Sequence, residues 1–298
     1  MGVQSAQLAK SASERAIFHE VQVLDTVTRY WLYPASEPLA KTVIFIHGYR
    51  GNHRGLEAIA GALPDLNVII PDLPGFGQST PFAGEHSIEN YSLWVSGFIS
   101  ALRLRQKPIL LGHSFGSIIC SAFAADCLDI EALILENPVS APALEGPNAP
   151  LTKLAQAFFG LSEKLPLKTG LWLLKSWPMV RGMSIVMTKS NNRSLRKWVH
   201  EHHDANFSDF ASRRVAIEGY RASISHNVSE YAAKFRVPVL IIIGSKDDIT
   251  PVELQHKMFE KISTPRSMIT LNTGHLTHYE KPLEVAAPIR ILAQAGIS

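Results

Sequence analysis

The sequence contains few cysteines, and their spacing excludes an intrachain disulfide. Cys120 and Cys127 are the two cysteines among 298 residues. Both fall in a segment with a helical pattern, where a rise of about 1.5 Å per residue places them on the order of 10 Å apart. Neither belongs to a Cys-x-x-Cys or metal-ligand spacing. Two reduced thiols fit a reducing compartment.

Strong charge and long apolar runs are also missing. The formal net charge is +3, and no block of lysine and arginine exceeds a few residues. We therefore expect no nucleic acid partner and no anionic membrane partner. Polar residues within positions 1–20 leave no apolar core long enough for a secretory signal. No later run approaches the roughly 20 apolar residues that span a bilayer. We expect a cytoplasmic protein without stable membrane insertion.

Apolar residues make up 46% of the chain, enough for a sizeable core, and their pattern predicts an α/β fold. Residues 17–24 and 28–33 alternate apolar with polar positions and predict an antiparallel hairpin. Short continuous apolar runs then alternate with segments of helical spacing, which is typical of a mostly parallel sheet covered by helices on both faces. The predicted strands are residues 42–46, 67–70, 108–111, 131–135, 237–243 and 267–271.

This alternation breaks in the second half of the chain. Between residues 139 and 229 helical patterns replace the strands, so we predict a helical cap (lid) inserted into the core. The core then comprises residues 1–138 and 230–298. The helices predicted in the cap are residues 151–165, 170–189, 194–203 and 207–224.

The stretch Gly112-His113-Ser114-Phe115-Gly116 lies between a predicted strand and a segment of small residues. A serine at a sharp turn from strand to helix has an exposed hydroxyl, and the glycines let strand and helix pack closely around the turn. This pattern predicts that Ser114 is a nucleophile.

A serine nucleophile needs a base, and the base needs a carboxylate to orient it. His275 directly follows the last predicted strand, whereas the rival His278 lies three residues further on. Asp247 and Asp248 both follow the strand that ends at residue 243. We favour Asp247, because Gly244, Ser245 and Lys246 turn the chain away from the strand and bring the fourth residue of the loop back over the edge of the sheet. We expect Asp248 to cap a helix or form a surface pair.

Stabilisation of an oxyanion requires two backbone N–H groups aimed at one point. The amide of Phe115, at the start of the helix after Ser114, is one candidate. The loop that follows the strand at residues 42–46 supplies the other, because Gly48 allows the backbone to present the amide of Tyr49. We expect His47 to brace this loop.

Five motifs in chain order resemble those of the α/β-hydrolase family. They are His47-Gly48, the loop from Asp72 to Ser79, the Gly112–Gly116 turn, the loop from Gly244 to Pro251, and Gly274-His275 with Glu280-Lys281-Pro282. The resemblance implies a mostly parallel sheet of eight strands and a helical cap between the sixth and seventh. A serine at position 114 implies acyl transfer, and the motif looks most like those of carboxylesterases and monoacylglycerol-type lipases.

The cap should form one wall of the substrate pocket. Its candidates for contact with an apolar acyl or aromatic group are Phe158, Trp172, Trp177 and Met183, although each could instead anchor the cap to the sheet. His200, His203 and Asp204 suggest a metal site on one helix face, but the serine mechanism needs no metal. We predict neither a metal nor another cofactor.

The leading hypothesis is a serine hydrolase that cleaves a small, apolar carboxylic ester through an acyl-enzyme on Ser114. One alternative is hydrolysis of a carbon–carbon bond in a ring-cleavage diketone. His113 and Leu276 weigh against that alternative, since such hydrolases typically have Asn and Trp at the matching positions. The other alternative is a weakly catalytic, ligand-binding relative.

Overall fold

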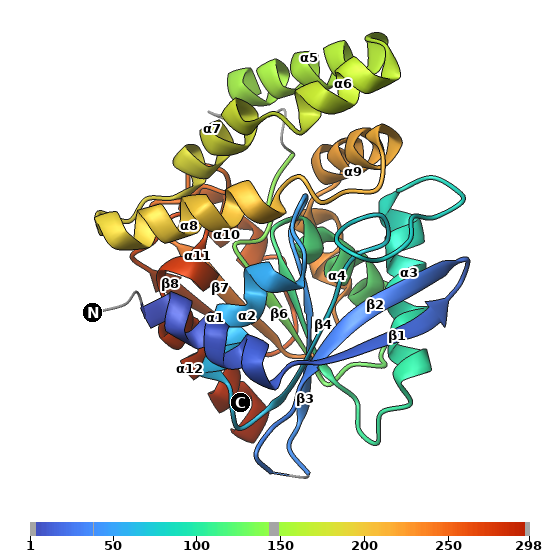
Figure 1. Cartoon of the computed structure of the whole chain (residues 1–298). Helices are drawn as coiled ribbons and strands as arrows, with labels where there is room; N and C mark the ends of the chain where they lie inside the picture. Colours follow the sequence, from blue (N-terminus) through green and yellow to red (C-terminus); the bar gives the residue numbers. More distant parts are fainter. Residues whose placement is uncertain (1–3, 38, 143–148, 296–298) are drawn as a thin grey trace.

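The computed structural model describes residues 4–37, 39–142 and 149–295. Its centre is an eight-stranded sheet with the order β1-β2-β4-β3-β5-β6-β7-β8 (Figure 1). The hairpin β1–β2 is antiparallel, and the strands from β3 to β8 are parallel to one another. The strands are β1 (Ile17–Val23), β2 (Thr26–Tyr33), β3 (Thr42–Ile46), β4 (Asn67–Pro71), β5 (Ile109–His113), β6 (Ala132–Glu136), β7 (Val239–Gly244) and β8 (Arg266–Leu271).

Each central strand buries alternate residues in two separate cores, because successive side chains point to opposite faces of a sheet. In β5, for example, Leu110 belongs to the core beneath α3 and α4, whereas Ile109 and Leu111 belong to the core beneath α1, α2 and α12. The near-continuous apolar runs of the sequence therefore reflect burial on both faces. Both the α/β class and the mostly parallel eight-stranded sheet are confirmed.

Helices cover both faces of the sheet, and η1 precedes α2 as a short 3-10 helix (Figure 1). The N-terminal α1 was not predicted, and it packs against α2. The core helices are α1 (Gln4–Arg15), η1 (His53–Leu56), α2 (Glu57–Ala62), α3 (Ile88–Leu102), α4 (Phe115–Asp126), η2 (Val228–Glu230), η3 (Ala232–Lys234), α10 (Val252–Phe259), α11 (Thr277–Glu280) and α12 (Pro282–Ala295).

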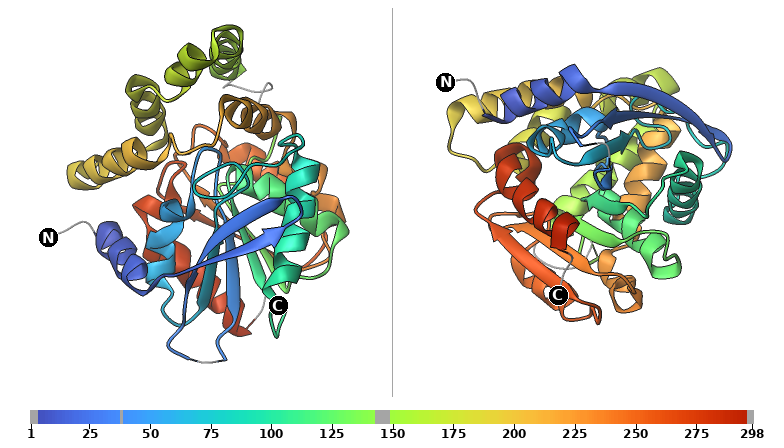
Figure 2. Two further views of the ribbon diagram at one scale, coloured as in Figure 1. Left: turned by 45° about the vertical axis from the view of Figure 1, so that its right-hand side comes forward. Right: turned by 90° about the horizontal axis from the view of Figure 1, so that it is seen from below.

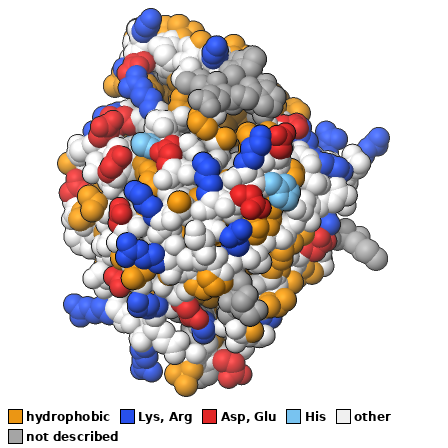
Figure 3. All heavy atoms as spheres, turned by 180° about the vertical axis from the view of Figure 1, so that it is seen from behind, with side chains coloured by type: hydrophobic (Ala, Val, Ile, Leu, Met, Phe, Trp, Pro, Cys, Tyr) orange, Lys and Arg blue, Asp and Glu red, His pale blue; other side chains and the backbone are white. Residues whose placement is uncertain are grey.

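A helical insertion between β6 and β7 forms the cap above the carboxyl ends of the strands (Figures 1 and 2). Its helices are α5 (Ala149–Lys164), α6 (Leu167–Leu174), α7 (Trp177–Met187), α8 (Arg193–Asn206) and α9 (Arg213–Ser225). The view from behind shows apolar side chains beside basic ones at the surface of the cap (Figure 3). The insertion itself is confirmed, while its predicted limits at residues 139 and 229 stay a prediction.

Two predicted cap helices are wrong in their bounds. The segment 170–189 is not one helix, because α6 ends at Leu174 and α7 begins at Trp177, with Pro178 in its first turn. A proline fits the first turn of a helix, where its missing N–H has no partner to lose. The segment 207–224 starts as a helix only at Arg213, after Ser212 caps it by accepting from the Val215 N–H.

Candidate active site

The turn between β5 and α4 holds Ser114 in an unusual backbone conformation. Ser114 has φ 50° and ψ −115°, and its N–H donates to the carbonyl of Glu136 on the neighbouring strand. Strand and helix approach closely there. A Cβ added to Gly112 would lie 2.4 Å from the Gly116 carbonyl oxygen, and one added to Gly116 would lie 2.3 Å from that of Ile46. Side chains at both positions would push the turn apart.

The structure brings the predicted nucleophile, base and acid together at the carboxyl ends of three strands. Ser114 Oγ lies 2.8 Å from His275 Nε2, and His275 Nδ1 lies 2.7 Å from Asp247 Oδ2. His275 is buried, and Asp247 has little exposure. These are hydrogen-bond distances at both nitrogens of one imidazole, so a proton on Nδ1 directed at Asp247 leaves Nε2 free to accept a hydrogen bond from the Ser114 hydroxyl.

The Asp247 carboxylate is held by several donors besides His275. Oδ2 also accepts from Asn137 Nδ2 at 2.8 Å and from Thr250 Oγ1 at 2.6 Å, and Oδ1 accepts from the Ile249 and Thr250 N–H groups. Burial acts to raise the pKa of this carboxyl, but His275 and these hydrogen bonds outweigh burial and hold the pKa at about 2. Asp247 is therefore ionised at neutral pH.

The two rival residues lie elsewhere. Asp248 points outward and pairs with Lys189 of the cap. His278 Nδ1 lies 3.0 Å from Glu136 Oε1. The structure therefore places Asp247 and His275, rather than these neighbours, in the hydrogen-bonded chain with Ser114.

The loop after β3 passes against Ser114. A Cβ added to Gly48 would lie 3.4 Å from Ser114 Cβ. His47 braces the loop as expected, because its Nε2 accepts from the Leu73 N–H at 2.9 Å. The Tyr49 ring packs against Phe115 at 6.3 Å between centroids. Both residues line the adjoining cavity, and the role of their amides in holding an oxyanion stays a prediction.

A cavity of about 670 Å³ lies between the sheet edge and the cap. Ser114 and His275 form part of its wall, and apolar side chains of the cap form much of the rest. Phe158 and Met183 line the cavity, as do Met179 and Ile224, among others. The other two cap candidates lie on the outside, with Trp172 69% and Trp177 60% exposed. The structure therefore brings two of the four cap candidates to the site.

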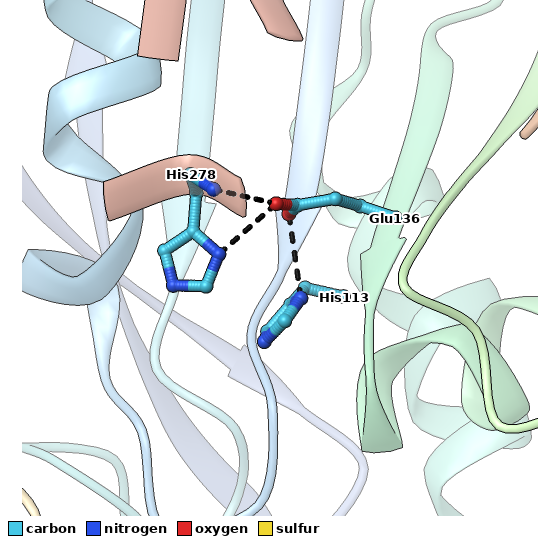
Figure 4. Close-up of side chains that lie close together, drawn as sticks. All are labelled: His113, Glu136 and His278. Atoms are coloured by element: carbon cyan, nitrogen blue, oxygen red, sulfur yellow. Dashed lines mark hydrogen bonds and ion pairs between the residues drawn. The ribbon is translucent and has the colours of Figure 1, made fainter. Parts of the chain in front are cut away.

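His113, Glu136 and His278 form a second group of buried polar side chains (Figure 4). Glu136 Oε1 accepts from the His278 N–H at 2.9 Å and from His278 Nδ1, and it also accepts from the Thr277 hydroxyl. The other oxygen, Oε2, lies 3.4 Å from His113 Nδ1. The His113 and His275 rings are 5.3 Å apart between centroids.

Burial and neighbouring side chains determine the protonation of His113 and Glu136. Burial, together with His278, lowers the pKa of His113 to about 4, so His113 is neutral at physiological pH. For Glu136, burial acts to raise the pKa, but His278 and His113 overcome it and hold the pKa well below its ordinary value. The result is one buried carboxylate facing two imidazoles.

His113, Glu136 and His278 are of types that bind divalent metals, and their ligand atoms lie within 4.8 Å of one another. Hydrogen bonds account for the arrangement, however. Glu136 Oε1 already accepts from three donors, and a metal would have to displace the Nδ1 proton that His278 donates to this oxygen. The group fits a hydrogen-bonded network better than a metal centre.

The cap histidines considered in the sequence do not converge on a metal position. His200 Nδ1 and His203 Nδ1 both lie within hydrogen-bond distance of Ser184 Oγ, at 2.6 Å and 2.8 Å. Asp204 instead pairs with Arg181 and accepts from the Trp177 indole N–H. These side chains join α7 to α8.

Sequence reasoning assigned no role to Glu136, Asn137, Thr250 or Thr277. The available signal was the polar pair Glu136-Asn137 at the end of a buried strand, since buried strand ends in parallel sheets carry site residues. Asn137 has φ 44°, and its side chain reaches Asp247. Glu136 instead faces His113 and the α11 segment.

Comparison with known proteins gives the same fold. Residues 43–287 match the model of the alpha/beta hydrolase family. Lipase 1 of Psychrobacter immobilis is 25% identical over 85% of this chain and 75% of its own, and monoacylglycerol lipase ABHD6 of Homo sapiens is 24% identical over 82% and 73%. The solved esterase EaEST of Exiguobacterium antarcticum superposes with a TM-score of 0.75 at 19% identity, over 94% of this chain and all of that one. The chain belongs to the alpha/beta hydrolase family.

Proposed function

We propose that the protein is a serine hydrolase that cleaves a carboxylic ester through an acyl-enzyme on Ser114. The observation that carries the proposal is the continuous chain of hydrogen bonds from Ser114 Oγ through His275 to Asp247, at the wall of a largely apolar cavity. Distant relatives named as lipases support the ester-hydrolase class.

In the acylation step His275 Nε2 takes the Ser114 proton while Oγ attacks the ester carbonyl carbon. Asp247 stays ionised and stabilises the imidazolium that forms. The Tyr49 and Phe115 amides hold the oxyanion of the tetrahedral intermediate, and Phe115 is well placed for this because it begins a helix, whose free N–H groups carry partial positive charge. His275 then protonates the leaving alcohol.

In the deacylation step His275 accepts a proton from the water that attacks the acyl carbon, and it then returns this proton to Ser114 Oγ as the acyl–oxygen bond breaks and the carboxylic acid leaves. The acyl group occupies the cavity beside Phe158 and Met183, where apolar side chains surround it. An uncharged, fairly apolar acyl or aromatic ester fits this environment best.

The first test is treatment with a fluorophosphonate, followed by mapping of the adduct by mass spectrometry. We expect a single adduct on Ser114 and a loss of esterase activity in proportion to labelling. Folded protein with no adduct on Ser114 would sink the proposal.

A substrate panel tests the reaction type. Aryl esters from acetate to palmitate should be hydrolysed, and a ring-cleavage diketone should not. Hydrolysis of the diketone with inert esters would point to carbon–carbon bond cleavage instead. Thermal stabilisation by ligands with no turnover of any ester would point to a binding protein.

A further inference from the structure

Glu136 is a fully buried carboxylate that ends β6 without a lysine or arginine partner among the residues described. Such a charge is costly unless donors satisfy it. Its donors are the Thr277 hydroxyl and two N–H groups of His278, while Oε2 faces His113 Nδ1. Figure 4 shows Nδ1 of both imidazoles turned toward the carboxylate and their second nitrogens turned away.

These partners belong to two of the three segments that carry Ser114, His275 and Asp247. His113 directly precedes Ser114, and it pairs with Glu136 in the register of β5 and β6. Thr277 and His278 follow His275 by two and three residues. The Glu136 main-chain carbonyl also accepts from the Ser114 N–H at 3.1 Å. One residue therefore contacts both the turn that holds the nucleophile and the segment that holds the base.

We propose that Glu136 is a positioning residue, which ties the His275 segment to the Ser114 turn through its contacts with His113, Thr277 and His278. The inference rests on the serine-hydrolase function proposed above. The Thr277 hydroxyl extends the tie, since it also lies 2.7 Å from Asn137 Oδ1, and Asn137 donates to Asp247. Glu136 is thus connected to Asp247 through the side chains of Thr277 and Asn137.

Glutamine at position 136 tests this role, because it keeps the shape of the side chain but replaces one carboxylate oxygen with an amide nitrogen, which cannot accept a hydrogen bond. Three donors converge on Oε1 of Glu136, and His113 Nδ1 lies 3.4 Å from Oε2. The substitution should therefore loosen the contact of residue 136 with the Ser114 turn or with the His275 segment.

The test compares wild type with Glu136→Gln. We expect kcat for an aryl ester to fall roughly 10-fold with little change in KM, because positioning acts on the reacting atoms more than on binding. The rate of fluorophosphonate labelling at Ser114 should fall in parallel.

The matched control is Glu57→Gln, which changes another buried carboxyl group, bonded to the Tyr33 hydroxyl at 3.1 Å. It should leave kcat and the rate of labelling at Ser114 within about 2-fold of wild type. Folded Glu136→Gln protein with an unchanged kcat, or with a change confined to KM, would overturn the proposal.

If Glu136→Gln does not fold, Thr277→Val decides, with Thr277→Ser as its conservative partner. Valine keeps the shape and removes the hydroxyl, so kcat should fall about 3-fold to 10-fold, while serine restores most of it. Equal kcat in the two variants would overturn the tie through Thr277. Failure of wild type to label at Ser114 would overturn the serine-hydrolase function itself, so the two failures are distinct.

Discussion

The two walls of the cavity differ in the interactions that their side chains make. On the core side, the polar groups of Ser114, His275 and Asp247 are held by hydrogen bonds to defined partners. On the cap side, Phe158 and Met183 offer apolar contact without directional bonds. Under the proposed function, the core side determines which bond is broken, whereas the cap side determines which acyl group fits.

The largest expected effect comes from removing the nucleophile. Ser114→Ala should lower kcat by about 10⁴-fold or more, because no other hydroxyl is positioned against His275 in the described residues. Circular dichroism and the melting temperature should match wild type, as a check on folding. Activity within 10-fold of wild type would place the chemistry elsewhere in the core.

Asp247→Asn should lower kcat by about 10³-fold, since the amide no longer favours the productive His275 tautomer. The variant also tests acid stability. The folded pKa of about 2 lies below the ordinary aspartate pKa of 3.8, so this carboxylate stabilises the fold above pH 4, and the contribution is lost as the pH falls toward 2. Urea unfolding at pH 3 and pH 7 should show a smaller difference in the variant than in wild type.

Arg50 joins the two walls. Its buried guanidinium donates to the carbonyls of Leu174 and Phe207, at the carboxyl ends of two cap helices, and it neighbours Tyr49. Arg50→Met should leave both carbonyls unpaired, at about 2 kcal/mol each, and lower the melting temperature by about 10 °C. The control Arg54→Met changes an exposed arginine of the same region. Equal melting temperatures would show that Arg50 does not hold the cap.

The cap wall is tested by filling the cavity at Gly182. This residue lines the cavity, and a Cβ there meets no other atom within 4 Å. Gly182→Leu should shift the preferred acyl length of aryl esters by about two to four carbons toward shorter chains, at similar kcat for acetate. Gly160→Leu is the control, because Gly160 has equal room but is not among the cavity-lining residues. An unchanged chain-length profile would assign acyl selectivity to the core.

The smallest effect is expected at Trp172, whose side chain is 69% exposed. Trp172→Ala should change kcat/KM for water-soluble aryl esters by less than about 2-fold, whereas Phe158→Ala, at the cavity, should raise KM several-fold for long acyl chains. A large loss in the Trp172 variant would mean that the outer face of the cap communicates with the cavity.

The core and its site were largely predictable from sequence. Parallel strands read as short apolar runs, and their carboxyl ends meet at one edge, so Ser114, Asp247 and His275 could be placed together without a structure. Each of these residues lies within four residues of the end of a strand, which is a strong positional signal.

The rest depended on information that periodicity does not carry. Glu136 faces His113 because of the register between β5 and β6, and it reaches His278 because the chain folds back after His275. Apolar spacing in the cap likewise predicts helices without showing which face meets the core. Trp172 therefore looked the same as Phe158 in the sequence, although one is outside and the other lines the cavity.

The rim of the cavity bears on how a ligand enters and leaves. Leu154, Val186 and Ile249 line the cavity and are also exposed at the surface, at 67%, 39% and 42%. The apolar lining therefore continues outward, so a hydrocarbon chain can pass between solvent and cavity while keeping apolar contact. Release of a long apolar acid should therefore be slower than release of a short one. For esters with long acyl chains, product release rather than bond cleavage would then limit turnover.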